Sequence, residues 1–142
     1  MVLLAVDYGD VRTGIAVCDK MQMLASPVGT IVERDAHKLI EKITEIARER
    51  KAEAIVVGEP VNMDGSRGWR AQACAEFAEQ LQEASGLPCH LYDERCTTMM
   101  AHNALNATNT RGKKRKAVVD TLSAVMILEG FMARNPVKGE IL

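Results

Sequence analysis

The sequence predicts an α/β protein in which a five-stranded mixed sheet carries helices on both faces. Three short apolar runs, separated by turn residues, open the 142-residue chain and indicate an antiparallel meander. Helical segments then alternate with two further apolar runs, which is typical of parallel strands joined by helices. The expected order is βββαβαβα, with the last helical stretch interrupted by a loop. No repeat or linker divides the chain, so residues 1–142 are expected to form a single domain.

The first three predicted strands make up the meander. Val2–Val6 and Gly14–Cys18 are apolar runs bounded by aspartate and glycine, and Met23–Ile31 supplies the third strand. Pro27 has no backbone N–H, which places part of the third strand at an edge or at a strand start. Because the connecting turns are short, neighbouring strands are expected to run antiparallel.

A helix and a buried strand follow the meander. Asp35 is a good N-cap for a helix whose charged residues face water. The run "AIVVG" at 54–58 then predicts a buried strand, and "EPVNMDGSRG" at 59–68 predicts a loop. The expected apolar stripe of the helix consists of Leu39, Ile40, Ile43, Ile46 and Ala47.

The second half of the chain predicts one more strand among helices. Trp69–Ala84 is expected to form a helix that Gly86 ends, and "CHLYDE" at 89–94 is expected to form the last strand. Ala117–Ala133 predicts the closing helix, since Pro136 follows it. The other expected segments are a helix over about Met99–Ala107, a mobile loop at 108–116 and a flexible tail at 134–142.

Charge and cysteine content exclude several classes of function. The formal net charge is −1, so nucleic-acid binding would need a local basic patch. The four cysteines form no C-x-x-C pair and no two histidines stand three to five residues apart, so a zinc site is not expected. No secretory signal or long uncharged apolar stretch is present. These observations predict a cytoplasmic protein with reduced thiols and no membrane partner.

Three carboxylates lie next to apolar residues, at positions where α/β proteins often have functional residues. Asp7 follows the first apolar run, Glu94 ends the last strand, and Asp120 lies within the closing helix. The first and last strands are expected to end at the same edge of the sheet, and the helix could bring Asp120 to that edge. Three carboxylates at one point repel each other unless a divalent cation such as Mg²⁺ neutralises them. Two such ions can hydrolyse a phosphodiester, so the pattern indicates nuclease chemistry.

Each of these carboxylates also has a simpler interpretation. Asp7 would serve only the turn that follows it, Glu94 would pair with the adjacent Arg95, and Asp120 would lean towards water. Composition leaves these alternatives open, and only the joint pattern favours a metal site.

Four stretches of the sequence resemble one known family. They are "VDYGDVRTGIAVCD", "IVVGEPVNMDGS", "YDERCTT" and "VVDTLSAVMILEGF", in that order and spacing. Together they resemble the YqgF/RuvX family, whose members are described as Holliday junction resolvases or pre-16S rRNA nucleases. The resemblance runs from about Leu3 to Phe131. It implies an RNase H-like fold and a hydrolase that acts on phosphodiester bonds with Mg²⁺ or Mn²⁺.

The resemblance also implies which residues carry the chemistry. The acidic positions of the family fall on Asp7, Glu94 and Asp120, which are expected to be both catalytic and metal-binding. The second stretch departs from the family, which has G-L-P where this chain has Gly58, Glu59 and Pro60. In RNase H-like nucleases more broadly a carboxylate often ends the fourth strand, so Glu59 competes with Glu94 as a metal ligand.

Basic residues near these carboxylates are candidates for nucleic-acid contacts. Arg12 stands in the turn after Asp7, and Arg67 and Arg70 stand in and after the loop at 59–68. A turn role for Arg12 and a solvated loop for the run "RGKKRK" are the alternatives. Without aromatic interleaving, this run favours contact with phosphates rather than reading of bases. Its candidate residues are Arg111, Lys113, Lys114, Arg115 and Lys116.

The leading hypothesis is a metal-dependent endonuclease that processes the 5′ end of pre-16S rRNA in ribosome biogenesis. A Holliday junction resolvase acting on branched DNA is the alternative within the family. A non-catalytic RNA-binding assembly factor is an alternative of another class. An ATPase of the actin and hexokinase type is a further one, but it needs two such domains and this chain has length for only one. The oligomeric state stays open between monomer and homodimer.

Overall fold

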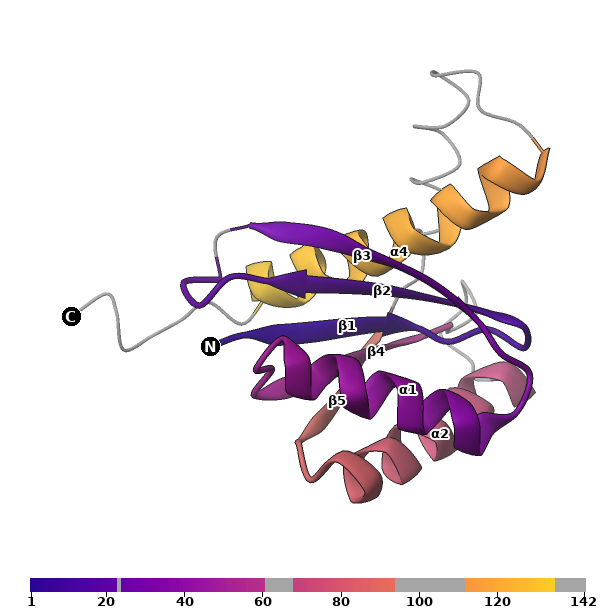
Figure 1. Cartoon of the computed structure of the whole chain (residues 1–142), viewed down its shortest axis with the longest axis horizontal. Coiled ribbons are helices and arrows are strands. Elements are labelled where there is room, and N and C mark those ends of the chain that lie inside the picture. The colour runs from indigo at the N-terminus through magenta and orange to yellow at the C-terminus, as the bar shows by residue number, and fades with distance from the viewer. Residues whose placement is uncertain (23, 61–67, 94–111, 135–142) are drawn as a thin grey trace.

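The structure is a computed structural model that describes residues 1–22, 24–60, 68–93 and 112–134, with side chains from Thr121 onward in the last range. Figure 1 shows a twisted sheet with helices packed on both of its faces. The predicted α/β class is confirmed. Three sequence predictions fall wholly or mostly outside the described residues, namely the loop at 59–68, the helix at about Met99–Ala107 and the tail beyond residue 134.

Five strands form one sheet in the order β3-β2-β1-β4-β5. Strand β1 is central and runs antiparallel to β2 but parallel to β4, and β5 is parallel to β4. The meander expected from the short turns is therefore confirmed, as is the parallel pairing of the later strands. The strand bounds are Leu3–Asp7 for β1, Arg12–Cys18 for β2, Ala25–Val32 for β3, Ala54–Glu59 for β4 and Cys89–Asp93 for β5.

Helices α1, Ala36–Glu49, and α2, Trp69–Ser85, cover one face of the sheet, and α4, Gly112–Arg134, covers the other (Figure 1). The ends of the first two helices follow from local chemistry. The side chain of Asp35 accepts hydrogen bonds from the backbone N–H groups of His37 and Lys38, as expected of an N-cap. Gly86 ends α2 with a φ of 74°, a left-handed conformation that glycine adopts without steric cost.

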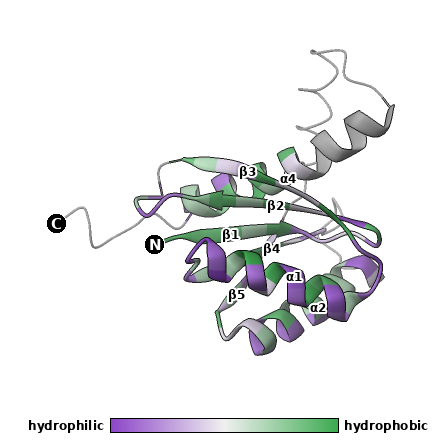
Figure 2. Ribbon diagram, viewed as in Figure 1, coloured by the Kyte–Doolittle hydropathy of each residue, from purple (hydrophilic) through white to green (hydrophobic). Residues whose placement is uncertain are grey.

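The hydrophobic core has two parts, one on each face of the sheet. Leu4 and Val6 of β1 pack with α1 and α2, whereas Leu3 and Ala5 pack with α4. Successive side chains of a strand point to opposite faces, so a continuous apolar run is expected for a strand covered on both sides. Figure 2 shows apolar residues along the central strands and on the inner sides of the helices, with polar residues outside.

The start of α4 differs from the sequence prediction. The basic stretch at 108–116 was expected to be a loop before a helix at Ala117, but the helix already begins at Gly112. Lysine and arginine are good helix formers, so a basic run can continue a helix as well as form a loop. Lys113, Lys114, Arg115 and Lys116 therefore occupy the first two turns of α4, which extend beyond the end of the sheet in Figure 1.

Several further boundaries differ by one or two residues; Asp7 and Glu59, expected just after their strands, are the last residues of β1 and β4. β2 begins at Arg12 rather than Gly14, because the ladder to β3 continues to the pair Arg12 and Val32. Arg134, expected in the C-terminal tail, is the last residue of α4. Among the described residues, no helix is both long enough and apolar enough to cross a membrane.

Candidate active site

Asp7 is the last residue of β1 and lies on the face of the sheet that α4 covers. Ala5 and Leu3, two and four positions earlier, pack against Ala124, Ile127 and Leu128 of α4. Strand alternation places Asp7 on this same face. Its side chain is only partly buried, so a carboxylate here can be reached from solvent.

A row of residues across the sheet connects Asp7 to α4. Asp7 pairs with Gly14 on β2, and Gly14 pairs with Thr30 on β3. The hydroxyl of Thr30 is hydrogen-bonded to that of Thr121 on α4, with 3.0 Å between the oxygens. Since Gly14 has no side chain, nothing projects from the middle of this row. Asp120 directly precedes Thr121, so α4 brings the backbone of Asp120 close to β3, at the same level of the sheet as Asp7.

Glu59 and Asp93 end the two strands beside β1. Glu59 is the last residue of β4 and is 5% exposed. It is level with Asp93, the last residue of β5. The register that pairs Val6 with Val57 brings Asp7 level with Gly58, one residue before Glu59. Carboxylates thus end three adjacent parallel strands at one edge of the sheet, where such sheets favour a functional site. The alternation that places Asp7 on the face of α4 places Glu59, two and four positions after Val57 and Ile55, on the face of α1 and α2.

The loop that follows Asp7 is held by close backbone packing. A side chain at Gly9 would overlap the carbonyl oxygen of Arg12, so this turn requires glycine. The backbone N–H of Gly9 donates to the hydroxyl of the buried Thr13 at 3.3 Å. Arg12 is the first residue of β2 and, two positions before Gly14, lies on the same face as Asp7. The sequence-based candidate Arg12 is therefore close to the edge where Asp7 ends its strand.

Arg70 links α2 to the loop that follows Asp7. Its guanidinium donates to the carbonyl oxygen of Tyr8 and pairs with the carboxylate of Asp10 at 2.8 Å. It also lies 5.0 Å from the centre of the Tyr8 ring, which stacks on Phe77 of α2. Sequence reasoning named Arg70 as a nucleic-acid contact and missed these partners. No local signal could have revealed them, since Asp10 and Arg70 are 60 residues apart.

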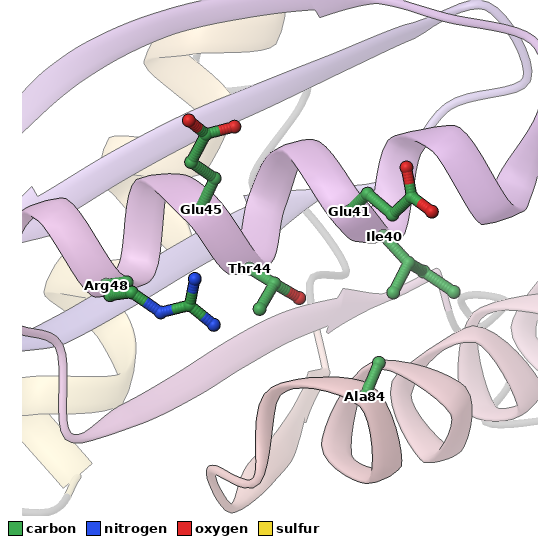
Figure 3. A pocket seen from close by; sticks show the side chains of 6 residues that line it. All are labelled: Ile40, Glu41, Thr44, Glu45, Arg48 and Ala84. Carbon is green, nitrogen blue, oxygen red and sulfur yellow. The ribbon is translucent and has the colours of Figure 1, made fainter.

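The described residues contain hollows on both faces of the sheet. One lies between α1 and α2 and is lined by Ile40, Glu41, Thr44, Glu45, Arg48 and Ala84 (Figure 3). It is on the opposite face from Asp7. Another, of about 640 Å³, is bounded by β5, the end of α4 and Glu59. Only the second one reaches the edge where the carboxylates end their strands.

Several predicted site residues cannot be placed by their side chains. Glu94, Arg67 and Arg111 lie outside the described residues, and α4 is described only by its backbone at Asp120 and at the basic positions from Lys113 to Lys116. Among the described side chains, no three histidine, cysteine, aspartate or glutamate residues form a group that could hold a metal. Asp7 and Glu59 supply carboxylate oxygens, the donors that Mg²⁺ and Mn²⁺ prefer.

Comparison with known families decides the class of protein. Residues 1–134 match the model of a family described as RuvX, Holliday junction resolvase. The chain belongs to the RuvX family. The predicted membership of this family is confirmed, and with it the expectation of a hydrolase acting on phosphodiester bonds.

Curated relatives match over nearly their whole length. One from Lachnospira eligens is 41% identical and one from Ruminiclostridium cellulolyticum is 36% identical, each over 135 residues. The matches cover 93–94% of this chain and 95–96% of the relatives. Both relatives are named "Putative pre-16S rRNA nuclease". Family description and relatives' names therefore agree on a nuclease and differ in the nucleic acid they name.

Solved structures agree with the RNase H-like fold expected for a RuvX protein. The structure of Thermus thermophilus RuvC in complex with a Holliday junction substrate superposes with a TM-score of 0.59. It covers 94% of this chain and 95% of that chain at 15% identity. At this identity the likeness concerns the fold alone.

Proposed function

We propose that the chain is a divalent-metal-dependent endonuclease that processes the 5′ end of pre-16S rRNA. The position of α4 relative to Asp7 is the observation that supports a metal site. Asp7 ends the central strand on the face of α4, and the Thr30–Thr121 hydrogen bond holds α4 over the same row of residues. Asp120 occupies the helix position four residues before the buried Ala124, and the helical period aligns these two positions. This placement supports a site built from β1 and α4.

Asp7, Glu94 and Asp120 are the proposed ligands of Mg²⁺ or Mn²⁺, and Glu59 is the alternative to Glu94. A bound ion would activate water and stabilise the charge that develops on the phosphate oxygens. The chain itself supplies the orientation. Gly9, Thr13 and Arg70 fix the loop after Asp7, and the pairing of β1, β2 and β3 fixes Asp7 relative to α4. Arg12 and Arg70 lie where a substrate phosphate would approach this loop, while Glu59 ends the neighbouring strand.

The start of α4 supports contact with phosphates. Four cationic residues, Lys113 to Lys116, occupy its first turns, and no acidic residue is present in the first turn. Cations are unfavourable at a helix N-terminus because the helix dipole is positive there. A phosphate of the substrate would relieve this repulsion and also accept hydrogen bonds from the free backbone N–H groups. Arg111 directly precedes this helix, and Arg67 precedes α2, so both belong to the same proposed contact set.

The choice of RNA rests on the names of the curated relatives, which cover almost the same length as this chain. A Holliday junction resolvase is the second candidate, and the description of the RuvX family favours it. The two activities use the same hydrolysis. They differ in the symmetry of the substrate, because a four-way junction suits a homodimer whereas an RNA end suits a monomer.

Cleavage of two substrates under four metal conditions tests the proposal. A precursor rRNA end and a four-way DNA junction are each incubated with Mg²⁺, Mn²⁺, Ca²⁺ or chelator. We expect cleavage of the RNA with Mg²⁺ or Mn²⁺, and binding with little cleavage in Ca²⁺, which is larger and coordinates more loosely. Cleavage that persists in chelator contradicts the metal mechanism. Preferential cleavage of the junction by a dimer supports the second candidate instead.

Carboxylate variants separate catalysis from a purely structural role in ribosome assembly. Asp7→Asn, Glu94→Gln, Asp120→Asn and Glu59→Gln are compared with Glu41→Gln, which changes an exposed carboxylate on α1. Loss of Asp7 or Asp120 should nearly abolish cleavage, and the double variant should be little worse than either single one, because both serve one site. Whichever of Glu59 and Glu94 abolishes cleavage is the further ligand. Full activity in Asp7→Asn would support the non-catalytic assembly factor.

A further inference from the structure

The hollow between β5 and the end of α4 has the chemistry of a nucleobase site. We propose that it binds one unpaired, unstacked base of the substrate strand, so that the enzyme requires a single-stranded segment next to the cleaved bond. This inference rests on the proposed nuclease function and deepens it. The hollow measures about 640 Å³, within the usual range for small-ligand pockets. Its principal lining residues are His90, Tyr92, Asp93, Phe131, Arg134 and Glu59.

Planar groups form the walls of the hollow. The rings of His90 on β5 and Phe131 on α4 lie 5.4 Å apart between centroids and are tilted by 31°. The guanidinium of Arg134 lies 5.3 Å from the centre of the Tyr92 ring. His90 is exposed, so part of this residue is accessible to a ligand. Aromatic side chains and arginine planes are the groups on which proteins stack single-stranded bases.

Carboxylates close one end of the hollow. Asp93 and Glu59 stand level on adjacent strands and both line it. An ionised carboxylate accepts hydrogen bonds at two oxygens, so it can serve a ligand besides any partner within the protein. The edges of adenine, cytosine and guanine carry N–H donors that a carboxylate can accept. Phosphates, by contrast, would be repelled at this end, so the base rather than the backbone of the substrate is the fitting occupant.

The position of the hollow connects it to the proposed cleavage site. Asp93 and Glu59 end β5 and β4 at the same edge where Asp7 ends β1, and the hollow extends from there along β5 to Cys89. A strand whose phosphate lies at Asp7 can therefore direct a neighbouring base towards β5. A base within a duplex cannot enter, because its faces are stacked and its edge is paired. The substrate class is accordingly an unpaired nucleotide flanking the scissile phosphate.

A fluorescent base reports directly on such stacking. Single-stranded RNA oligonucleotides carry 2-aminopurine at successive positions near the cleavage site, and binding is measured in Ca²⁺ by anisotropy and by quenching. Quenching should be strong at one position only. His90→Ala should remove it and weaken binding roughly 5-fold or more, as expected for loss of a stacking partner. His37→Ala is the matched control, since it removes an exposed histidine from α1 on the other face of the sheet.

The possible outcomes distinguish this inference from the proposed function. Position-specific quenching that Asp7→Asn retains and His90→Ala loses supports the base site, even if neither substrate is cleaved. Metal-dependent cleavage of RNA without such quenching, or with equal affinity in His90→Ala and His37→Ala, overturns the base site and leaves the nuclease proposal intact. If His90→Ala instead dissociates a homodimer, β5 is an edge for a second copy and the inference is wrong.

Discussion

At the scale of single residues, Arg70 holds the loop after Asp7 through three contacts. Its guanidinium contacts the Tyr8 carbonyl, the Tyr8 ring and the Asp10 carboxylate. The side chain of Asp10 is 75% exposed, so the ion pair itself contributes little. The carbonyl contact and the ring contact are better shielded, and they fix the residue that follows Asp7.

We therefore expect Arg70→Ala to destabilise the fold by about 1–2 kcal/mol, through loss of a charged hydrogen bond and a cation–π contact. Asp10→Asn should cost less than about 0.5 kcal/mol. Arg70→Ala should also raise the Mg²⁺ concentration needed for half-maximal cleavage, because Asp7 loses the support of its loop. Thermal unfolding and a metal titration of cleavage measure the two effects. Equal destabilisation by both variants would show that the ion pair dominates.

Asp35 gives a prediction with a definite pH dependence. Hydrogen bonds from the backbone N–H groups of Lys38 and His37 lower the pKa of this carboxyl. A lowered pKa in the folded state stabilises the protein above the ordinary aspartate pKa, and this contribution is lost as the pH falls through the folded value. Asp35→Ala should therefore lower Tm at pH 7 but much less near pH 3. Asp35→Asn, which keeps a capping oxygen, should depend less on pH.

At the scale of elements, the basic residues at the start of α4 lower the stability of the helix, and we propose that they contact substrate phosphates. The basic positions of its first turns repel the helix dipole, so removing two charges should leave the helix as stable or more stable. We expect Lys113→Ala with Lys114→Ala to keep or raise Tm while weakening nucleic-acid binding for all sequences alike. The slope of log affinity against log salt should decrease by about one per lost phosphate contact.

The matched control for this variant is Lys20→Ala with Lys38→Ala, which makes the same change in net charge at exposed positions outside the basic first turns of α4. If the control reduces the salt slope equally, the effect comes from net charge and not from α4. If neither variant changes the slope, the basic turns of α4 do not contact the substrate.

The elements also show which parts of the fold local sequence can predict. Short turns implied the antiparallel meander, Asp35 marked the start of α1, and Gly86 marked the end of α2. The start of α4 could not be predicted from the sequence, because a run of lysine and arginine is compatible with a helix or a loop. Contacts of this basic run with a neighbouring element, or with a substrate, decide between a helix and a loop. Such contacts are not visible in the local periodicity of the sequence.

At the scale of the whole molecule, the site depends on register across the sheet and on one helix crossing it. The position of Asp7 at the end of β1 was predictable from an apolar run that stops at a carboxylate. Its relation to α4 was not, because Thr30 and Thr121 are 91 residues apart and their contact follows from the pairing of three strands. The same holds for Glu59 beside Asp93, which depends on the parallel register of β4 and β5.

Metal binding at this edge should be measurable as stability of the entire fold. Without a cation, the carboxylates that we propose to share one site would repel each other, so Asp7→Asn should be at least as stable as the wild type in chelator. An ion that binds only the folded state stabilises it by about 2.7 kcal/mol at a hundredfold excess over Kd. Mg²⁺ or Mn²⁺ should therefore raise the Tm of the wild type and of Glu41→Gln but not that of Asp7→Asn. Thermal unfolding with and without chelator measures this directly, and an equal rise in all three proteins would place the metal elsewhere.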